Sequence, residues 1–350
     1  MRRAAAVPLA AAALLLSGCG QLGYLSQSLS GHLSLISSAR PVEDWLADPA
    51  LKPALRERLL LSQQMRDFAI AELHLPANSS YRRYADLKRG AAVWNVVATP
   101  ELSLQPKTWC FPVMGCVAYR GYFDRGAADA YAEELRREEG LEVIVGAVPA
   151  YSTLGWSNWF GGDPLLNTFI AYPEGELARM VFHELAHQIA YAADDTTFNE
   201  SFATAVERLG AEAWMQQKAS PQARQDYQRG LERRQQFRAL ADATRRRLQE
   251  VYAGSGDDVG KRADKARVMA EFRADYQRIK TEQWEGYAGY DDWVARANNA
   301  SFALLAAYGE LTPAFEALFE RLGRDWPRFY AEVKRLAALP KAQRRAELAG

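Results

Sequence analysis

The stretch L-A-R-M-V-F-H-E-L-A-H-Q-I-A-Y at residues 177–191 determines how the rest of the chain is interpreted. It contains no glycine or proline and is rich in alanine and leucine, so it predicts a helix. In a helix, His183 and His187 lie on one face, about one turn apart. Because the chain has only 4 histidines, a pair that flanks Glu184 at this spacing is informative.

Two histidines in this arrangement can direct their ring nitrogens to one metal ion, as tetrahedral Zn²⁺ requires. The residue that follows the first histidine lies beside the open coordination position. Glu184 is therefore predicted to be the general base, which takes a proton from the attacking water and returns it to the leaving amine. The predicted chemistry is hydrolysis of a peptide bond without a covalent intermediate, with one Zn²⁺ per chain as the cofactor.

A catalytic zinc site needs a third protein ligand. No histidine follows His187, so the ligand must be a carboxylate, and the metzincin pattern with its extra downstream histidine is excluded. A turn after residue 191 and a second helix that begins near Asn199 would form a helical hairpin. Glu200 then lies about one turn inside the second helix, close to His187. The competing candidates are Glu207, Asp194 and Asp195.

The run Asn199-Glu200-Ser-Phe-Ala203 matches the Asn-Glu-x-x-Ala element that supplies the third ligand in the gluzincins, and the chain resembles these zinc peptidases. W-C-F-P-V-M-G-C-V-A-Y-R-G-Y-F from residue 109, A-Y-S-T-L-G-W from 150 and D-P-L-L-N-T-F from 163 look like the predicted aminopeptidase family of proteobacterial lipoproteins. This resemblance covers most of the mature chain. It implies Glu200 as the third ligand, one zinc ion and a peptide substrate, and the short distance from His187 implies a tight hairpin.

The first 18 residues have the features of a secretory signal. Two arginines precede an uncharged run at residues 4–16, which is too short to span a bilayer as a helix. The L-S-G-C that follows resembles the lipobox of bacterial lipoproteins and implies cleavage before Cys19 and lipidation of its thiol. The alternative is an ordinary cleaved signal with an incidental cysteine. Gly20 stands where an aspartate would retain a lipoprotein in the inner membrane, so the outer membrane, facing the periplasm, is the predicted location.

Residues 19–40 are rich in serine, glycine and leucine and predict a lipidated cysteine with a tether, so that the peptidase domain spans residues 41–350. Export to an oxidising compartment also bears on the two remaining cysteines. Cys110 and Cys116 enclose a short loop with proline and glycine, and we expect them to form a disulfide. A zinc site made from these two cysteines is the alternative.

Outside the central helix, the sequence predicts an α+β fold that is predominantly helical. Residues 42–75 have apolar side chains at helical spacing. Three runs of β-branched and aromatic residues predict a small sheet, at 93–98, 117–123 and 141–146. A helix at 126–139 crosses it, and nearly everything from Glu174 onward predicts helix. We therefore expect a zincin-like active-site helix with a small N-terminal sheet and long C-terminal helices.

The charges of the chain are balanced, with 43 lysines and arginines against 43 aspartates and glutamates. No field of one sign favours nucleic acid, and the G-x-G-x-x-G and Walker patterns are absent, so we predict neither a nucleic-acid nor a nucleotide partner. Arginine clusters such as R-R-Q-Q-F and T-R-R-R-L-Q lie within residues 218–283. Because acids are interleaved with them, they predict solvated helix faces. A basic patch for anionic lipid or lipopolysaccharide is the alternative.

Other polar and aromatic residues of the chain are compatible with more than one role. His32 and His74 lie in the tether and the N-terminal helix, and we expect solvated or hydrogen-bonded polar side chains there, not ligands. The uncharged run Y-S-T-L-G-W at 151–156 predicts either an edge strand or a cleft wall that pairs with an extended peptide. Tyr151 and Tyr191 are candidates to stabilise the tetrahedral oxyanion, and their placement in space decides between them.

The predicted function is removal of N-terminal residues from peptides. An exopeptidase must also hold the free α-amine of its substrate, and the sequence assigns no residue to that task. An endopeptidase of the cell envelope is one alternative, and it would cleave blocked peptides. A lipoprotein scaffold that keeps the zincin fold and the metal is another. Glu184 argues against the scaffold, because a binding protein needs no base at that position.

Overall fold

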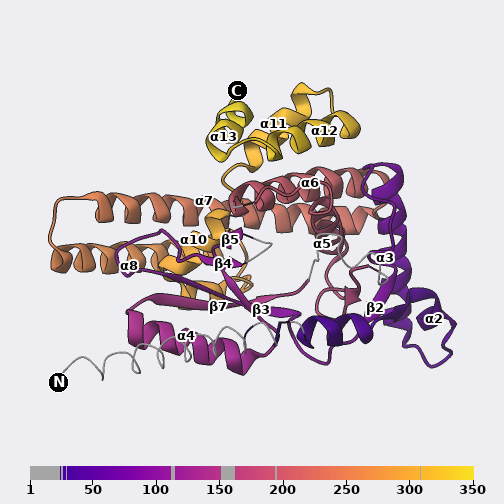
Figure 1. Cartoon of the computed structure of the whole chain (residues 1–350), viewed down its shortest axis with the longest axis horizontal. Helices are drawn as coiled ribbons and strands as arrows, with labels where there is room; N and C mark the ends of the chain where they lie inside the picture. The colour runs from indigo at the N-terminus through magenta and orange to yellow at the C-terminus, as the bar shows by residue number, and fades with distance from the viewer. Residues whose placement is uncertain are drawn as a thin grey trace, which may run out of the picture.

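The structure is a computed structural model, and it describes residues 24, 27–28, 30–111, 115–150, 162–193, 195–307 and 309–350. The fold is α+β and predominantly helical, which confirms the predicted fold class. Figure 1 shows the central strands with one helix beneath them and the long C-terminal helices above. Within the described ranges, no helix is both long and apolar enough to cross a membrane. The predicted signal at 1–18, Cys19 and Tyr151 lie outside these ranges.

Regular structure begins earlier in the sequence than predicted. Residues 30–37 are helical, and Leu35 is buried in the main hydrophobic core. Arg83 holds the end of this helix, because its guanidinium donates to the carbonyl oxygens of Ile36 and Ala39. The tether predicted for residues 19–40 therefore contains a helix, because Leu35 of the serine-rich run is buried in the core.

The helical region at 42–75 is divided into α2 (Val42–Ala47) and α3 (Pro53–Ala71). Asp48, which follows α2, has an extended backbone and ends the first helix. Pro53 begins α3, a position where the missing N–H of proline costs no hydrogen bond. α3 then packs beside the central helix of the chain (Figure 1).

The main sheet has the strand order β6-β3-β7 and is antiparallel. β3 (Val93–Thr99) pairs along its whole length with β7 (Glu142–Val148), and β6 (Arg120–Tyr122) pairs with its other edge. α4 (Arg125–Glu139) covers one face of this sheet with small buried side chains such as Ala128 and Ala132. β3, β7 and the crossing helix thus lie where the sequence predicts them.

The predicted strand at 117–123 is divided between two sheets. Its first residue belongs to β5 (Gly115–Val117), which forms a two-stranded hairpin with β4 (Trp109–Phe111). A disulfide joins Cys110 to Cys116, which are directly opposed in this hairpin. A further small sheet has the order β1-β2-β8 and consists of β1 (Arg40–Pro41), β2 (Arg83–Ala85) and β8 (Leu165–Leu166).

Two helices at the centre of the molecule form an antiparallel hairpin, α5 (Glu174–Ala186) and α6 (Thr196–Gln217). Both helices carry fully buried apolar side chains, including Phe182 of α5 and Phe202 of α6. Gly210 of α6 allows this close approach, because a Cβ atom there would lie 3.0 Å from the Phe182 ring. Burial of this apolar surface fixes the two helices against each other and so fixes the polar residues that they carry.

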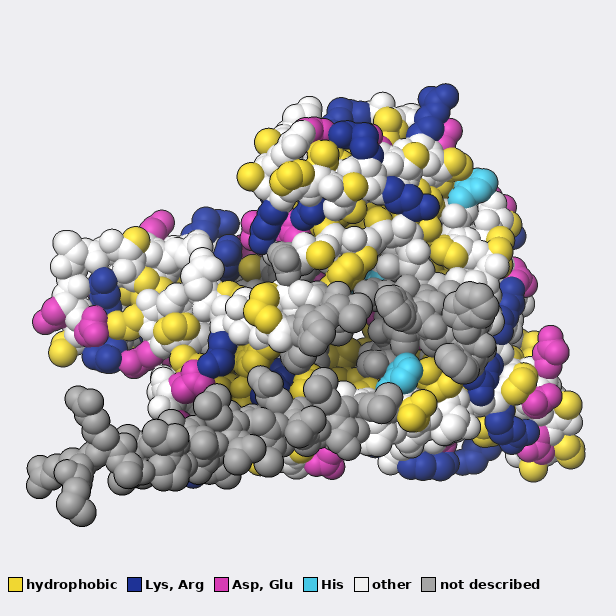
Figure 2. All heavy atoms as spheres, in the orientation of Figure 1, with side chains coloured by type: hydrophobic (Ala, Val, Ile, Leu, Met, Phe, Trp, Pro, Cys, Tyr) yellow, Lys and Arg dark blue, Asp and Glu magenta, His cyan; other side chains and the backbone are white. Residues whose placement is uncertain are grey.

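The C-terminal half consists of helices. They are α7 (Pro221–Ala253), α8 (Asp258–Glu282), α9 (Asp291–Arg296), α10 (Asn299–Ala307), α11 (Thr312–Arg321), α12 (Trp326–Ala337) and α13 (Lys341–Ala349). α7 and α8 form a long hairpin arm on which lysines and arginines alternate with acids on the face shown in Figure 2. That face has the character of the solvated helix surface predicted from the sequence.

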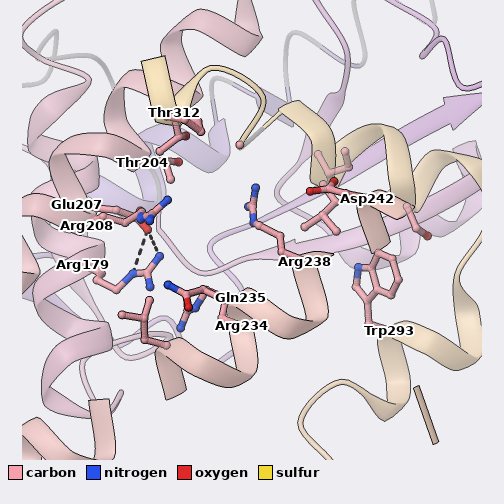
Figure 3. A pocket seen from close by; sticks show the side chains of 16 residues that line it. Arg179, Thr204, Glu207, Arg208, Arg234, Gln235, Arg238, Asp242, Trp293 and Thr312 are labelled. Atoms are coloured by element: carbon pink, nitrogen blue, oxygen red, sulfur yellow. Dashed lines mark hydrogen bonds and ion pairs between the residues drawn. The ribbon is translucent and has the colours of Figure 1, made fainter. Parts of the chain in front are cut away.

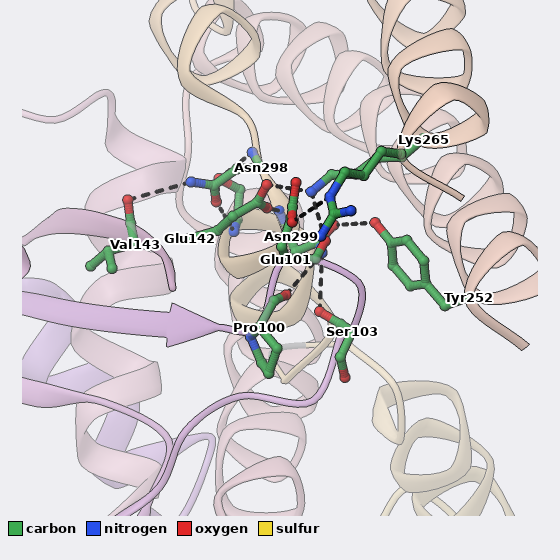
Figure 4. Close-up of polar contacts among 11 residues, drawn as sticks. Pro100, Glu101, Ser103, Glu142, Val143, Tyr252, Lys265, Asn298 and Asn299 are labelled. Atoms are coloured by element: carbon green, nitrogen blue, oxygen red, sulfur yellow. Dashed lines mark hydrogen bonds and ion pairs between the residues drawn. The ribbon is translucent and has the colours of Figure 1, made fainter. Parts of the chain in front are cut away.

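Asn299, fully buried at the start of α10, connects the C-terminal helices to the main sheet (Figure 4). Its Nδ2 group donates to three carbonyl oxygens of the loop after β3, those of Pro100, Glu101 and Ser103. Its Oδ1 accepts a hydrogen bond of 2.7 Å from the Tyr252 hydroxyl of α7. Lys265 of α8 forms an ion pair with Glu142 of β7. These contacts satisfy buried polar groups and hold the arm against the sheet.

Candidate active site

His183, His187 and Glu200 meet at the mouth of the α5–α6 hairpin. The two histidine Nε2 atoms lie 3.1 Å apart, and Glu200 Oε2 lies 3.4 Å from the first and 3.7 Å from the second. In tetrahedral zinc sites with bonds of 2.0–2.2 Å, neighbouring donor atoms are about 3.3–3.5 Å apart. The three side chains are almost entirely buried. The donor set and its spacing could therefore hold a metal ion.

The end of α5 differs slightly from the prediction. α5 ends at Ala186, and His187 is the residue that caps it, with helical backbone angles of φ −57° and ψ −21°. Its N–H still donates to the carbonyl oxygen of His183. The chain can therefore turn immediately after the second histidine, which brings the next helix close to the ligand atoms.

Asn199 closes the turn between α5 and α6. Its Oδ1 accepts from the N–H of Ala192 at 2.8 Å, and its Nδ2 donates to the Ala192 carbonyl at 2.9 Å. Asn199 is buried, and this reciprocal pair ties the connecting segment to the first turn of α6. Glu200, the next residue, is thereby directed at the histidines. The asparagine of the Asn-Glu-x-x-Ala element thus has a positioning role.

α6 begins at Thr196, earlier than the predicted start near Asn199, because Asp195 caps it and accepts from the N–H of Phe198. The Asp195 carboxylate is fully buried and pairs with two arginines of α13, Arg344 at 2.8 Å and Arg345 at 2.5 Å. It lies outside the group of ligand atoms. Asp195 was therefore wrong as a ligand candidate, and Asp194 lies outside the described residues.

Glu207, the other competing candidate, lies on the far side of His183. Its Oε2 is 2.7 Å from His183 Nδ1, so that the Nε2 atom of the ring faces the ligand triangle. Its Oε1 accepts from Arg179 Nε at 3.0 Å. A carboxylate at the second nitrogen of a ligand histidine fixes the ring orientation and its tautomer. Glu207 therefore holds the His183 ring from the side opposite the candidate ligand group and does not belong to that group, and sequence spacing alone did not reveal this role.

The electrostatics of the ligand group differ from residue to residue. Burial lowers the pKa of His187 to about 4, so its ring is neutral near pH 7 and can bind a metal. Burial acts in the same direction on His183, but the carboxylates of Glu200 and Glu207 outweigh it and raise its pKa. Burial opposes ionisation of Glu207 as well, yet Arg179 and His183 lower its pKa to about 2.

Glu184 lies beside the ligand triangle and is half-buried. Burial raises its pKa to about 7, with His183 opposing the shift and with Glu200 and Asp163 adding to it. Asp163 itself is buried. The charges of Glu200 and Asp163 disfavour a further negative charge on Glu184, and a cation bound nearby would relieve this repulsion.

A loop from the N-terminal half supports the end of α5. Ser80 Oγ accepts from the N–H of Asp163 at 3.2 Å and from the Gln188 side chain at 3.1 Å. Gln188 also accepts from Asn78 at 2.6 Å. Arg66, fully buried, donates to the Ser80 carbonyl at 2.9 Å. These bonds fix the residue after His187 and the segment that carries Asp163 in one arrangement.

Two tyrosines, Tyr119 and Tyr81, lie within electrostatic reach of the carboxylates. Burial raises the pKa of Tyr119, and Glu200, Tyr191 and Glu184 add to the shift. Tyr81 is fully buried, and its pKa is raised by burial first and then by Glu184. Tyr191, one of the two predicted candidates, is half-buried after α5, whereas Tyr151 is outside the described residues. Tyr119 and Tyr81 were missed because strand pairing and the Ser80 loop, not sequence spacing, bring them here.

The other two histidines do not belong to the ligand group of the described residues. His74 is exposed after α3, with a backbone φ of 51°. His32 is partly buried, and burial lowers its pKa while Asp163 opposes the shift.

One family model matches most of the chain. The family model described as "Putative aminopeptidase" matches residues 23–348. The chain belongs to this family. Neither a curated protein nor a solved structure matches it. Because the match includes both helices of the hairpin, the family assignment covers the residues that form the ligand group.

Proposed function

We propose that this member of the aminopeptidase family is a zinc-dependent peptidase that removes N-terminal residues from peptides. The observation that supports zinc most directly is the triangle of donor atoms, with two imidazole nitrogens and one carboxylate oxygen at separations of 3.1, 3.4 and 3.7 Å. Two histidines and one glutamate are a ligand set of catalytic zinc sites, which leave a further position open. The family assignment supports the choice of peptide as substrate.

Each residue has a defined task in this proposal. His183, His187 and Glu200 hold the ion, which when bound polarises the scissile carbonyl and makes water more acidic. Glu184 takes the proton from the attacking water and delivers it to the leaving amine. Glu207 keeps the His183 ring in place through the bond to Nδ1. Tyr119, whose hydroxyl lies within electrostatic reach of both Glu200 and Glu184, is our candidate to donate to the developing oxyanion.

The proposal is tested by measuring hydrolysis of free and N-acetylated peptides with the wild type and with Glu184→Gln. Loss of a positioned general base reduces kcat by about 10²–10⁴-fold. The amide is isosteric and lies outside the ligand group, so we expect the variant to keep its zinc. Hydrolysis of free peptides alone identifies an aminopeptidase, and equal cleavage of acetylated peptides identifies an endopeptidase. A variant as active as the wild type, or bound zinc without turnover in the wild type, contradicts the proposal and favours a binding scaffold.

We also propose that the mature protein is a lipoprotein anchored through Cys19 at the outer membrane and facing the periplasm. The support is the signal-like run at 4–16, followed by L-S-G-C and Gly20. Labelling of cells with a radioactive fatty acid tests it. We expect label in the wild type and none in Cys19→Ser, with Cys116→Ser as the cysteine control that keeps the label. An unlabelled wild-type protein would rule out the anchor.

A further inference from the structure

A cavity of about 450 Å³ lies between α6, α7 and α10, behind the proposed metal site (Figure 3). Its charged lining consists of four arginines and two acids, namely Arg179, Arg208, Arg234, Arg238, Glu207 and Asp242. The arginines of the lining outnumber its acids, and two of them pair with acids outside the lining. The sequence predicted arginine-rich helix faces in this region, but α7 turns part of its arginines inward.

Three of the four arginines already have acid partners. The pairs are Arg179 with Glu207, Arg208 with Glu316 at 3.1 Å and Arg234 with Glu176 at 2.6 Å. Arg238 forms no hydrogen bond or ion pair with any residue that the structure describes. Figure 3 shows its guanidinium in the space between Glu207 and Asp242. Burial lowers the pKa of Arg238, although the acids Asp242 and Glu207 oppose the shift. A half-buried guanidinium without a partner is unusual, because buried charges are normally paired.

Two further donors of the lining are unsatisfied. Arg179 Nη1 and Arg234 Nε are buried and have no hydrogen-bond partner among the described residues. Arg179 as a whole is only 6% exposed. A buried donor without an acceptor costs free energy, and such groups in native proteins require an explanation. A ligand that brings oxygen atoms into the cavity would satisfy them.

We propose that this cavity binds a small molecule through an oxyanion, a carboxylate or a phosphate group. Guanidinium groups bind both oxyanions through paired, charge-assisted hydrogen bonds. The volume is within the range of small-molecule sites. Leu231, Leu305 and Trp293 line the remainder and offer an apolar surface to the rest of such a molecule.

The oxyanion site is distinct from the proposed substrate site. Glu207 separates the two, because its Oε1 faces Arg179 of the cavity and its Oε2 faces His183 Nδ1. The inference therefore does not depend on the peptidase proposal. Arg179 is a poor position for a test, because its loss would release Glu207 and disturb His183. Arg238 forms no hydrogen bond or ion pair with Glu207, so its substitution breaks no contact that holds His183.

Calorimetric titration of the purified protein with inorganic phosphate and, separately, with acetate at constant ionic strength tests this inference. We expect one anion per chain in the wild type. Arg238→Gln should weaken binding at least about tenfold, since one charge-assisted bond is lost. Arg234→Gln serves as a second variant of the lining. Arg246→Gln is the matched control, because Arg246 lies on the same helix, is exposed and does not line the cavity.

Saturable binding of either probe identifies the oxyanion that the site accepts. A dissociation constant that is unchanged in Arg246→Gln but increased in Arg238→Gln and Arg234→Gln supports the inference. If neither phosphate nor acetate binds, or if all three variants bind as the wild type does, the oxyanion site does not exist. Circular dichroism shows whether each variant is folded.

Discussion

Two acidic residues at the start of α6 lie five positions apart and have opposite surroundings. Asp195 is fully buried and pairs with Arg344 and Arg345, so its charge is balanced within the protein. Glu200 is nearly as buried, but its neighbours are two histidines and the carboxylate of Glu184. The difference shows how to separate a structural buried carboxylate from one that is arranged to bind a cation.

The structural role of Asp195 is tested by the substitution Asp195→Ala. Removal of the carboxylate leaves Arg344 buried without its acid and removes the cap of α6. Breaking a buried pair from one side costs about 3–5 kcal/mol of the free energy of unfolding. Urea denaturation measures this loss. Glu310→Ala is the control, because Glu310 contacts Arg345 only at 3.8 Å and is half exposed, so we expect a loss of less than about 1 kcal/mol. Equal losses in the two variants would show that Asp195 is not structural.

We also predict that the difference in stability between the wild type and Asp195→Ala depends on pH. Burial alone would raise the pKa of Asp195, but hydrogen bonds from Arg345 and Arg344 outweigh it and lower the pKa. A carboxyl whose pKa is lower in the folded state stabilises the fold above its unfolded pKa of about 4, and this stabilisation is lost as the pH falls through the folded pKa. The difference in unfolding free energy between wild type and Asp195→Ala should therefore be constant near neutral pH and narrow below about pH 4.

The support that Glu207 gives to the proposed metal site is tested by the substitution Glu207→Gln. Removal of the charge that orients His183 should weaken zinc binding about 10–100-fold, as is typical for residues behind a metal ligand. Competition with a chelator of known affinity measures the effect. Glu212→Gln is the control on the same helix, because Glu212 is exposed and bonds only to Gln216. Equal zinc affinities in the two variants would mean that Glu207 does not support the metal site.

The central hairpin could be predicted from the sequence because its signals are local. The spacing of His183 and His187 and the length of the turn before Glu200 are properties of one short segment. The partners of Asp195 could not be predicted, because Arg344 follows it by 149 residues and α13 packs there only in the folded protein. The orienting role of Glu207 depends on which nitrogen of His183 it faces, and spacing does not determine that.

The other differences between the structure and the sequence-based prediction also arise from contacts that form only in the folded protein. Tyr119 comes close to the carboxylates through the pairing of short strands, whose ends a single sequence places poorly. The arginines of α7 looked solvated because acids are interleaved with them, yet packing against α6 and α10 turns Arg234 and Arg238 toward a cavity. The serine-rich segment before Pro41 appeared to be a tether, but Leu35 is buried in the core.

The measurement that tests the central claim most directly is the zinc content of the purified protein, by elemental analysis, for the wild type, Glu184→Gln and Glu200→Gln. Because Glu200 belongs to the ligand triangle and Glu184 does not, we predict one zinc per chain in the wild type and in Glu184→Gln. We predict little or none in Glu200→Gln. A wild-type protein without a bound metal, or Glu200→Gln with full zinc content, would contradict the assignment of His183, His187 and Glu200 as a zinc site.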